Sequence, residues 1–196
     1  MTAADPSGRL VRPAVPQDAR AIAAVHVATW RDAYAGLLPG DVLDGLDAGE
    51  RAETWRGRLA ALPDDTSGVF VFVVELDAEV RGFVSGGPSR DGGAGGEVYA
   101  IYVDPRFQGR GGGSRLLEAA ARQLAGSGFA EASLWVLADN RAARGFYESQ
   151  GWGPDGTEQP WTYHGAGEGL VEVRYIRNLG ASVSRAGTGQ PSGRTR

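Results

Sequence analysis

Residues 97–120 have the sequence EVYAIYVDPRFQGRGGGSRLLEAA, which predicts a strand, a glycine-rich turn and a helix in direct succession. The run 97–103 is rich in β-branched and aromatic residues, and Asp104-Pro105 ends it. From 114 to 125, Leu and Ala recur at helical spacing and give the helix one apolar face. A helix N-terminus presents unpaired N–H groups and a partial positive charge. The turn is therefore a candidate anion-binding site.

Strand and helix patterns alternate on both sides of this segment. We expect strands at 10–11, 69–74, 79–85 and 132–138, and one or two strands from Trp152 onward, the last at 170–176. Helices are expected at about 16–34 and 140–150, with one or two helical segments between 42 and 62, and a glycine-rich connection at 86–96. This order predicts a mixed α/β sheet in a single domain, residues 9–178. Residues 1–8 are expected to form a flexible leader. Residues 180–196 are polar and Gly/Ser-rich, which predicts a disordered tail.

The composition excludes several kinds of site. All 20 basic residues of the 196-residue chain are Arg, and Cys is absent. Without Lys there is no Walker-type phosphate loop and no Schiff-base lysine. Without Cys there is no disulfide, thiolate nucleophile or Cys-ligated zinc. His26 and His164 lack the spacing of a metal site, so we predict no metal and interpret both as ordinary core or surface residues.

Charge and hydropathy indicate the compartment and exclude two classes of partner. The net charge of −4 argues against binding to nucleic acid or to an anionic membrane. No apolar stretch approaches the roughly 20 residues that span a bilayer. The first residues have neither the basic start nor the apolar run of a signal peptide. We therefore expect a cytoplasmic protein with no nucleic-acid and no membrane partner.

The glycine-rich turn fits one phosphate-binding pattern better than the others. A dinucleotide fingerprint, G-x-G-x-x-G counted from Gly109, fails because Ser114 holds its last position. The pattern that does match is Q-x-x-G-x-G, with Gln108, Gly111 and Gly113. Positive charge near the turn comes from Arg106, Arg110 and Arg115. The turn is interpreted as a pyrophosphate cradle, and the alternative is a glycine-rich connection without a ligand.

Residues 97–120, followed by LWVLADNRAARGFYESQGW at 134–152, resemble the GNAT superfamily of acetyl-CoA-dependent N-acetyltransferases. The resemblance covers about residues 9–178. It implies a GNAT-type acyl-CoA N-acyltransferase fold, in which a mostly antiparallel sheet is splayed between its fourth and fifth strands by a bulge. It also implies that the pantetheine arm pairs with backbone groups of Ile101, Tyr102 and Val103.

The same resemblance implies the remaining contacts to acetyl-CoA, the expected cosubstrate. Backbone N–H groups of the loop would hold the pyrophosphate, at Gln108, Gly109, Arg110, Gly111, Gly112, Gly113 and Ser114. Gly112 departs from the aliphatic residue that is more usual at its place. Asn140 would lie against the cofactor arm. Because Asp139-Asn140 precedes a helix, Asn140 also suits an N-cap, and one side chain can do both.

Two side chains are the candidate catalytic pair. By resemblance, Tyr147 would protonate the departing thiolate, and a phenol with an ordinary pKa near 10 is chemically fit for this. Glu97 lies on the strand where histone-type relatives have a glutamate base, and burial in a cleft would suit that role. The alternatives are a solvated carboxylate at Glu97, a proton relay through Tyr99 or Tyr102, and ordered water.

The predicted acceptor is the primary amine of a small molecule. The acceptor region of the family corresponds to the first two helices, where aromatic and acidic residues gather: Trp30, Asp32, Tyr34, Asp41, Asp44, Asp47 and Glu50. Such residues suit a cationic amine, although acidic helix surfaces are common. The absence of Cys favours direct transfer. The alternatives are a protein N-terminal acetyltransferase and a non-catalytic acyl-CoA sensor module. Homodimers are frequent in the family, and no pattern here fixes the oligomeric state.

Overall fold

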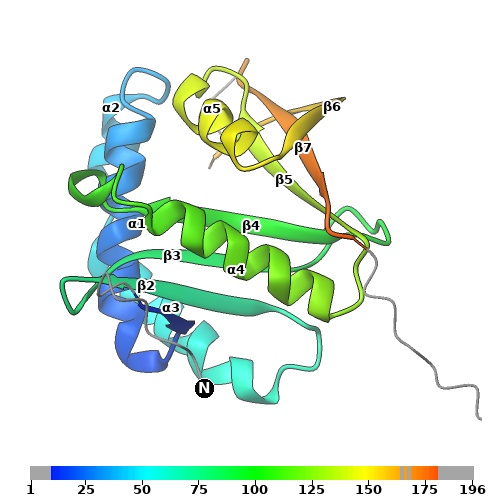
Figure 1. The fold of residues 1–196 in the computed structure, drawn as a ribbon. Helices are drawn as coiled ribbons and strands as arrows, with labels where there is room; N and C mark the ends of the chain where they lie inside the picture. The colour runs from blue at the N-terminus through cyan, green and yellow to red at the C-terminus, as the bar shows by residue number, and fades with distance from the viewer. Residues whose placement is uncertain (1–9, 164–165, 167–168, 181–196) are drawn as a thin grey trace, which may run out of the picture.

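The computed structural model describes residues 10–163, 166 and 169–180 (Figure 1). The predicted leader, His164 and the predicted tail beyond Gly180 lie outside the described residues. The strands are β1 Leu10–Pro13, β2 Phe70–Leu76, β3 Glu79–Pro88, β4 Gly96–Val103, β5 Glu131–Leu137, β6 Gly153–Pro160 and β7 Val171–Asn178. The α-helices are α1 Ala19–Ala33, α2 Gly40–Asp44, α3 Ala48–Ala61, α4 Gly112–Gly126 and α5 Arg141–Ser149. Short 3-10 turns are η1 Pro16–Asp18, η2 Leu62–Asp64 and η3 Pro105–Phe107.

The strands form one sheet in the order β1-β2-β3-β4-β5-β7-β6. Every neighbouring pair is antiparallel except β4 and β5, which are parallel. The predicted mixed, mostly antiparallel sheet is therefore confirmed. β4 and β5 pair only where Gly96–Val98 faces Ala132–Leu134. Figure 1 shows β5 running away from β4 toward α5, which is the splay expected between the fourth and fifth strands.

An irregularity in β4 lies next to the point where the two strands part. Ser85 of β3 faces Ala100 of β4, but the next residue, Gly86, faces Val98. Tyr99 is thus an extra residue without a partner in β3, as in a β-bulge. A bulge bends its strand and disrupts the ladder locally. It therefore accounts for the divergence of β4 from β5 beyond Val98.

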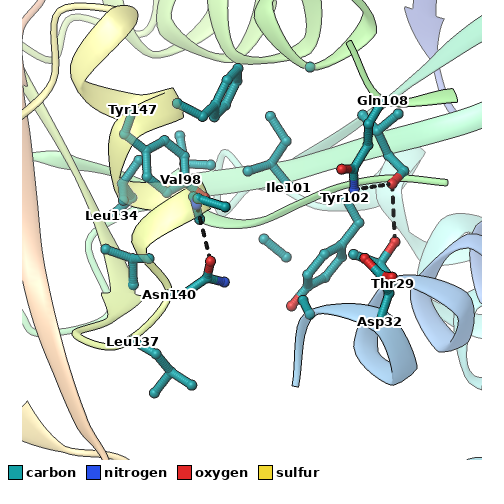
Figure 2. Close-up of a pocket in the computed structure, with 18 of the residues that line it drawn as sticks. Thr29, Asp32, Val98, Ile101, Tyr102, Gln108, Leu134, Leu137, Asn140 and Tyr147 are labelled. Carbon is teal, nitrogen blue, oxygen red and sulfur yellow. Dashed lines mark hydrogen bonds between the residues drawn. The ribbon is translucent and has the colours of Figure 1, made fainter. Parts of the chain in front are cut away.

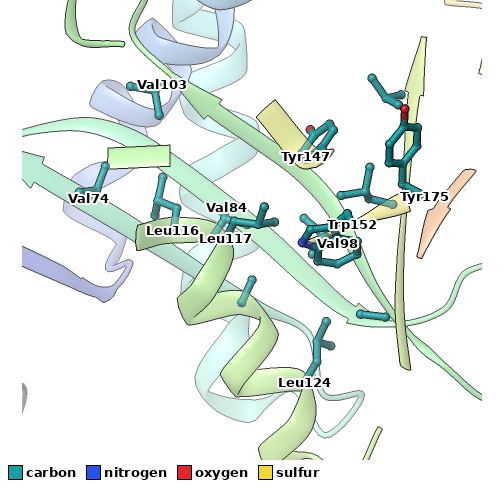
Figure 3. Close-up of a cluster of buried hydrophobic side chains, with 14 of the residues drawn as sticks. Val74, Val84, Val98, Val103, Leu116, Leu117, Leu124, Tyr147, Trp152 and Tyr175 are labelled. Carbon is teal, nitrogen blue, oxygen red and sulfur yellow. The ribbon is translucent and has the colours of Figure 1, made fainter. Parts of the chain in front are cut away.

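Helices cover both faces of the sheet. Side chains alternate along a strand, so neighbouring residues serve opposite faces. Val71, Val73 and Phe83 pack with α1 and α3. Val74 and Val84 pack with α4 instead, whose face toward the sheet consists of Leu116, Leu117, Ala120 and Leu124 (Figure 3). This second core continues past the splay through Tyr147, Trp152 and Tyr175. The core thus holds the diverging halves of the sheet together.

Gly86, beside the bulge, has no room for a side chain. A Cβ at this position would lie 2.6 Å from the carbonyl oxygen of Glu97 and 2.7 Å from Cζ of Phe70. Gly86→Ala is expected to lower the free energy of unfolding by about 3 kcal/mol, measured by urea denaturation. The control is Gly57→Ala in α3, where a Cβ meets open space and should stabilise the helix slightly. Equal midpoints for the two variants would contradict the prediction.

His26 lies in the core against Tyr102, with ring centroids 5.0 Å apart and nearly parallel planes. Neither ring nitrogen has a hydrogen-bond partner within the described part of the chain. Burial, together with the charges of Arg51 and Arg58, lowers the pKa of His26 to about 3. The interpretation of His26 as an ordinary core histidine agrees with this position.

The lowered pKa of His26 makes stability depend on pH. An unfolded histidine takes up a proton near pH 6.5, whereas the folded one stays neutral. Stability is therefore expected to fall as the pH drops from about 6.5 toward 3, by up to about 1.4 kcal/mol per pH unit. Urea denaturation of wild type and His26→Phe between pH 7 and 5 checks this. The variant should have the shallower dependence, and identical slopes would refute the assignment.

Candidate functional site

A cavity of about 730 Å³ opens where β4 and β5 diverge (Figure 2). Its walls come from the end of α1, from β4, β5 and β7, from the glycine-rich loop and from α5. Most of the predicted site residues line it, namely Ile101, Tyr102, Val103, Gln108, Gly109, Gly111, Gly112, Gly113, Ser114, Asn140 and Tyr147. Arg110 and Glu97 do not. The fold thus brings the two sequence motifs to one cavity.

The glycine-rich loop ends in an open helix N-terminus. Gly109 and Gly111 have φ values of +72° and +80°, a left-handed conformation that side chains disfavour. α4 begins at Gly112, two residues before the predicted start. The N–H of Arg115 donates to the carbonyl of Gly111, in the i to i−4 pattern of the helix. The N–H groups of residues 112–114 precede this ladder and lie at the cavity, which suits an anion.

Two loop features refine the predicted cradle. A Cβ at Gly112 would make ordinary contacts of 3.5 Å with Leu76 and Val74, so the close approach of these side chains does not by itself require glycine here. The arginines are partly neutralised by neighbours. Arg106 hydrogen-bonds twice to Asp104, and the exposed Arg110 lies 3.5 Å from Asp77. The attraction for an anion therefore depends mainly on backbone N–H groups.

The carbonyl of Val103 is already engaged by the protein. The Nε2 group of Gln108 and the hydroxyl of Thr29 both donate to it, each at 3.3 Å (Figure 2). A ligand that contacts this carbonyl would compete with both donors. The N–H of Asp104 donates to Arg81 of β3, so by alternation along the strand the backbone groups of Tyr102 also face β3, whereas those of Ile101 face the gap. Of the three predicted β4 positions, Ile101 therefore has the free strand edge.

Asn140 caps α5 and also lines the cavity. Its Oδ1 accepts a hydrogen bond of 3.0 Å from the N–H of Ala143 (Figure 2). Because only the oxygen is used in this cap, the amide NH2 group can still donate to a ligand. The cap is present in the structure, while the cofactor contact stays a prediction.

Tyr147 lies on α5, across the gap from Ile101 (Figure 2). Burial, and then the nearby Tyr102, raises the pKa of Tyr147 above its ordinary value. Burial likewise raises the pKa of Tyr34 and Tyr102, whose hydroxyls interact with each other. Tyr102 also accepts a hydrogen bond of 3.1 Å from Trp30. These phenols are all protonated at neutral pH, so each can donate a proton or a hydrogen bond.

Glu97 does not reach the cavity. Its side chain is only 1% exposed and forms an ion pair with Arg90. The backbone N–H of Arg90 donates to Oε2 at 2.8 Å, and the guanidinium donates to Oε1. The carboxylate is therefore committed to the β3–β4 connection. Glu97 is buried, as expected for a base, but it does not line the cavity.

Two carboxylates line the cavity instead. Asp32, from α1, belongs to the acceptor region expected from the sequence. Glu172, from β7, is a residue that sequence analysis missed. It is half-buried, it accepts a hydrogen bond of 3.0 Å from Gln159, and burial raises its pKa. In the sequence, Glu172 is only an acidic residue within the predicted strand 170–176. Its pattern does not reveal which strand lies next to it in the sheet.

Neither a metal cluster nor a membrane span is found within the described ranges. No three His, Asp or Glu side chains there gather as a metal ion would require. No helix there is both long and apolar enough to cross a bilayer.

Comparisons with known proteins agree with the two motifs. The model of the acetyltransferase (GNAT) family matches residues 27–152. The uncharacterized N-acetyltransferase YuaI of Bacillus subtilis is 38% identical over 132 residues, which are 66% of this chain and 72% of that protein. The mycothiol acetyltransferase of Mycobacteroides abscessus is 34% identical over 138 residues, 69% of this chain but only 42% of that protein.

A solved structure of the same fold covers most of this chain. The PaiA N-acetyltransferase from Thermoplasma acidophilum, crystallised with coenzyme A, superposes with a TM-score of 0.69 and 16% identity. The match covers 87% of this chain and 98% of that one. At this identity, the likeness concerns the fold.

Proposed function

Because this chain belongs to the acetyltransferase (GNAT) family, we propose that it transfers the acetyl group of acetyl-CoA directly to the primary amine of a small molecule. The observation that carries the proposal is the arrangement of the cavity. One end is an open helix N-terminus, and the interior contains a buried phenol and two carboxylates. These are the groups needed to hold a diphosphate, to protonate a thiolate and to attract an ammonium ion.

The proposal assigns residues to acetyl-CoA along its length. The N–H groups at the start of α4 would hold the diphosphate, with Gly109 and Gly111 shaping the loop. The β4 edge beyond Val98, which β5 leaves unpaired, would hold the pantetheine arm at the backbone groups of Ile101. Asn140 would donate its amide to the same arm. The loop and the strand edge border one cavity, which supports a single elongated ligand.

Tyr147 is the proposed acid. Acetyl-CoA supplies a thioester whose carbonyl carbon an uncharged amine can attack. Tyr147 keeps its proton at neutral pH because burial raises its pKa, and so it can deliver that proton to the departing sulfur. Direct transfer is supported by the composition, since no Cys is present to form an acyl-enzyme thioester.

A small acceptor is favoured by the site and by one group of relatives. Asp32 and Glu172 place negative charge at the cavity, as a cationic amine would require. One group of relatives carries the name mycothiol acetyltransferase, and this chain spans less than half of the M. abscessus protein. We therefore rank a small amine above a protein N-terminus and above a purely regulatory CoA-binding role.

Thiol release from acetyl-CoA tests the proposal. The purified protein is assayed with a panel of small primary amines and with peptides that have free N-termini, and its melting temperature is measured with CoA. We expect stabilisation by CoA and thiol release with at least one small amine. Release with peptides alone would favour N-terminal acetylation. Stabilisation without any release would favour the sensor role.

A further inference from the structure

We propose that Glu172, rather than Glu97, is the catalytic base that receives the acceptor's ammonium group and takes its proton. This inference rests on the proposed function and specifies its acceptor site. Glu172 lies on β7 directly opposite Leu137 of β5, the last residue of that strand. Leu137 and Glu172 both line the cavity. The carboxylate is therefore placed where β5 has moved away from β4.

Glu172 and the proposed acid line the same cavity and share two neighbours. Glu172 interacts electrostatically with Tyr34 and with Tyr102. Tyr34 and Tyr102 interact in turn with Tyr147. A base and an acid for aminolysis must reach the same tetrahedral centre from different sides. β7 and α5 supply the two groups from different elements of the fold.

The two glutamates differ in what their oxygens do. Both oxygens of Glu97 are taken by Arg90. Among the described residues, Glu172 receives its one side-chain hydrogen bond at Oε2, from Gln159 at 3.0 Å. Oε1 is left for a ligand. An ammonium group entering the cavity can therefore bind Glu172 without breaking an existing ion pair.

The charges around Glu172 come from several elements. Burial is the main cause of its raised pKa, and the nearby charges of Glu97 on β4 and Asp91 in the β3–β4 connection act in the same direction. The hydrogen bond from Gln159 on β6 and the charge of Arg90 lower the pKa. Tyr34 and Tyr102 face Glu172 as neutral phenols. A carboxylate with a raised pKa is a better proton acceptor at neutral pH.

In the proposed reaction, Glu172 and Tyr147 each carry one proton between defined atoms. Glu172 takes one proton from the acceptor ammonium, which leaves a neutral amine. The amine nitrogen bonds to the thioester carbonyl carbon, and the carbon–sulfur bond then breaks. Tyr147 gives its proton to the sulfur and recovers a proton from the attacking nitrogen. Glu172 finally releases its proton to water, so the net products are the amide, the free thiol and one proton.

The pH dependence of turnover tests this inference, with the best small amine of the panel as the probe. Wild type should lose kcat/KM on the acidic side as Glu172 becomes protonated. Glu172→Gln should lower kcat/KM at least tenfold at pH 7 and abolish its decline at acidic pH, the acidic limb of the profile. Stabilisation by CoA should be unchanged. The matched control is Glu158→Gln, an exposed position on the neighbouring β6, which should keep both rate and limb.

Gln159→Leu tests the role of Glu172 through the pH at which kcat/KM falls on the acidic side. A merely structural role of Glu172 would leave this pH unchanged. The hydrogen bond from Gln159 lowers the pKa of Glu172, so its loss should shift the acidic limb to higher pH. If Glu172→Gln keeps the wild-type limb, or if Glu97→Gln alone abolishes it, the inference is wrong while the proposed function stands. If no amine is acetylated by wild type, the proposed function fails and this inference fails with it.

Discussion

Tyr147→Phe is expected to lower kcat by about a hundredfold or more, whereas the dissociation constant for CoA should hardly change. Loss of a positioned general acid typically costs a factor of 10² to 10⁴. Phe keeps the ring of Tyr147, which packs in the core with Trp152 and Tyr175. The variant therefore removes the hydroxyl while it preserves the packing of α5 against the sheet. Steady-state thiol release and calorimetric titration with CoA measure the two quantities.

Tyr175→Phe is the matched control for this experiment. Tyr175 is fully buried in the same core, and its hydroxyl donates to Glu148 and accepts from Arg144. Tyr175 is absent from the residues that line the cavity. We expect this variant to be less stable but to keep kcat within a few-fold. If Tyr147→Phe also keeps kcat within threefold, Tyr147 is not the acid.

Local sequence predicted the elements of the fold because each carries its own signal. Alternation and helical spacing report burial directly, so β2, α4 and β5 were placed within two residues at most of their ends. β3 was predicted too short because Gly86 and Gly87 suggested a loop. In the structure, these glycines are strand residues with no space for a Cβ, since Glu97 and Tyr99 lie against them. A glycine in a strand can mark close approach rather than a turn.

The candidate site likewise has a part that local sequence predicts and a part that depends on contacts between distant segments. The loop 108–114 was predictable because its residues are contiguous and act through the backbone. The position of Glu97 was predicted, but its partner was not, because Arg90 reaches it across the β3–β4 connection. Glu172 was missed because the last strand, β7, inserts between β5 and β6. That order is a long-range property of the sheet, which periodicity within one strand cannot report.

Gly111→Val is expected to weaken CoA binding by at least thirtyfold, or about 2 kcal/mol. Gly111 caps α4 with a φ of +80°, which a β-branched residue adopts only with strain. The chain would relieve this strain by rotating the neighbouring peptides. The N–H groups at the start of α4 would then turn away from the diphosphate, and each charged hydrogen bond lost costs about 1.5–3 kcal/mol. Calorimetric titration with CoA measures the effect.

Gly128→Val separates backbone strain from ligand binding. Gly128 lies just beyond the other end of α4 and has a φ of +93°, with open space around its Cα. The two variants should therefore lose similar amounts of stability in urea. Only the variant at position 111 should lose affinity for CoA, because only that end of α4 borders the cavity. Equal CoA affinities for the two variants would mean that the glycines at this helix start serve folding rather than the ligand.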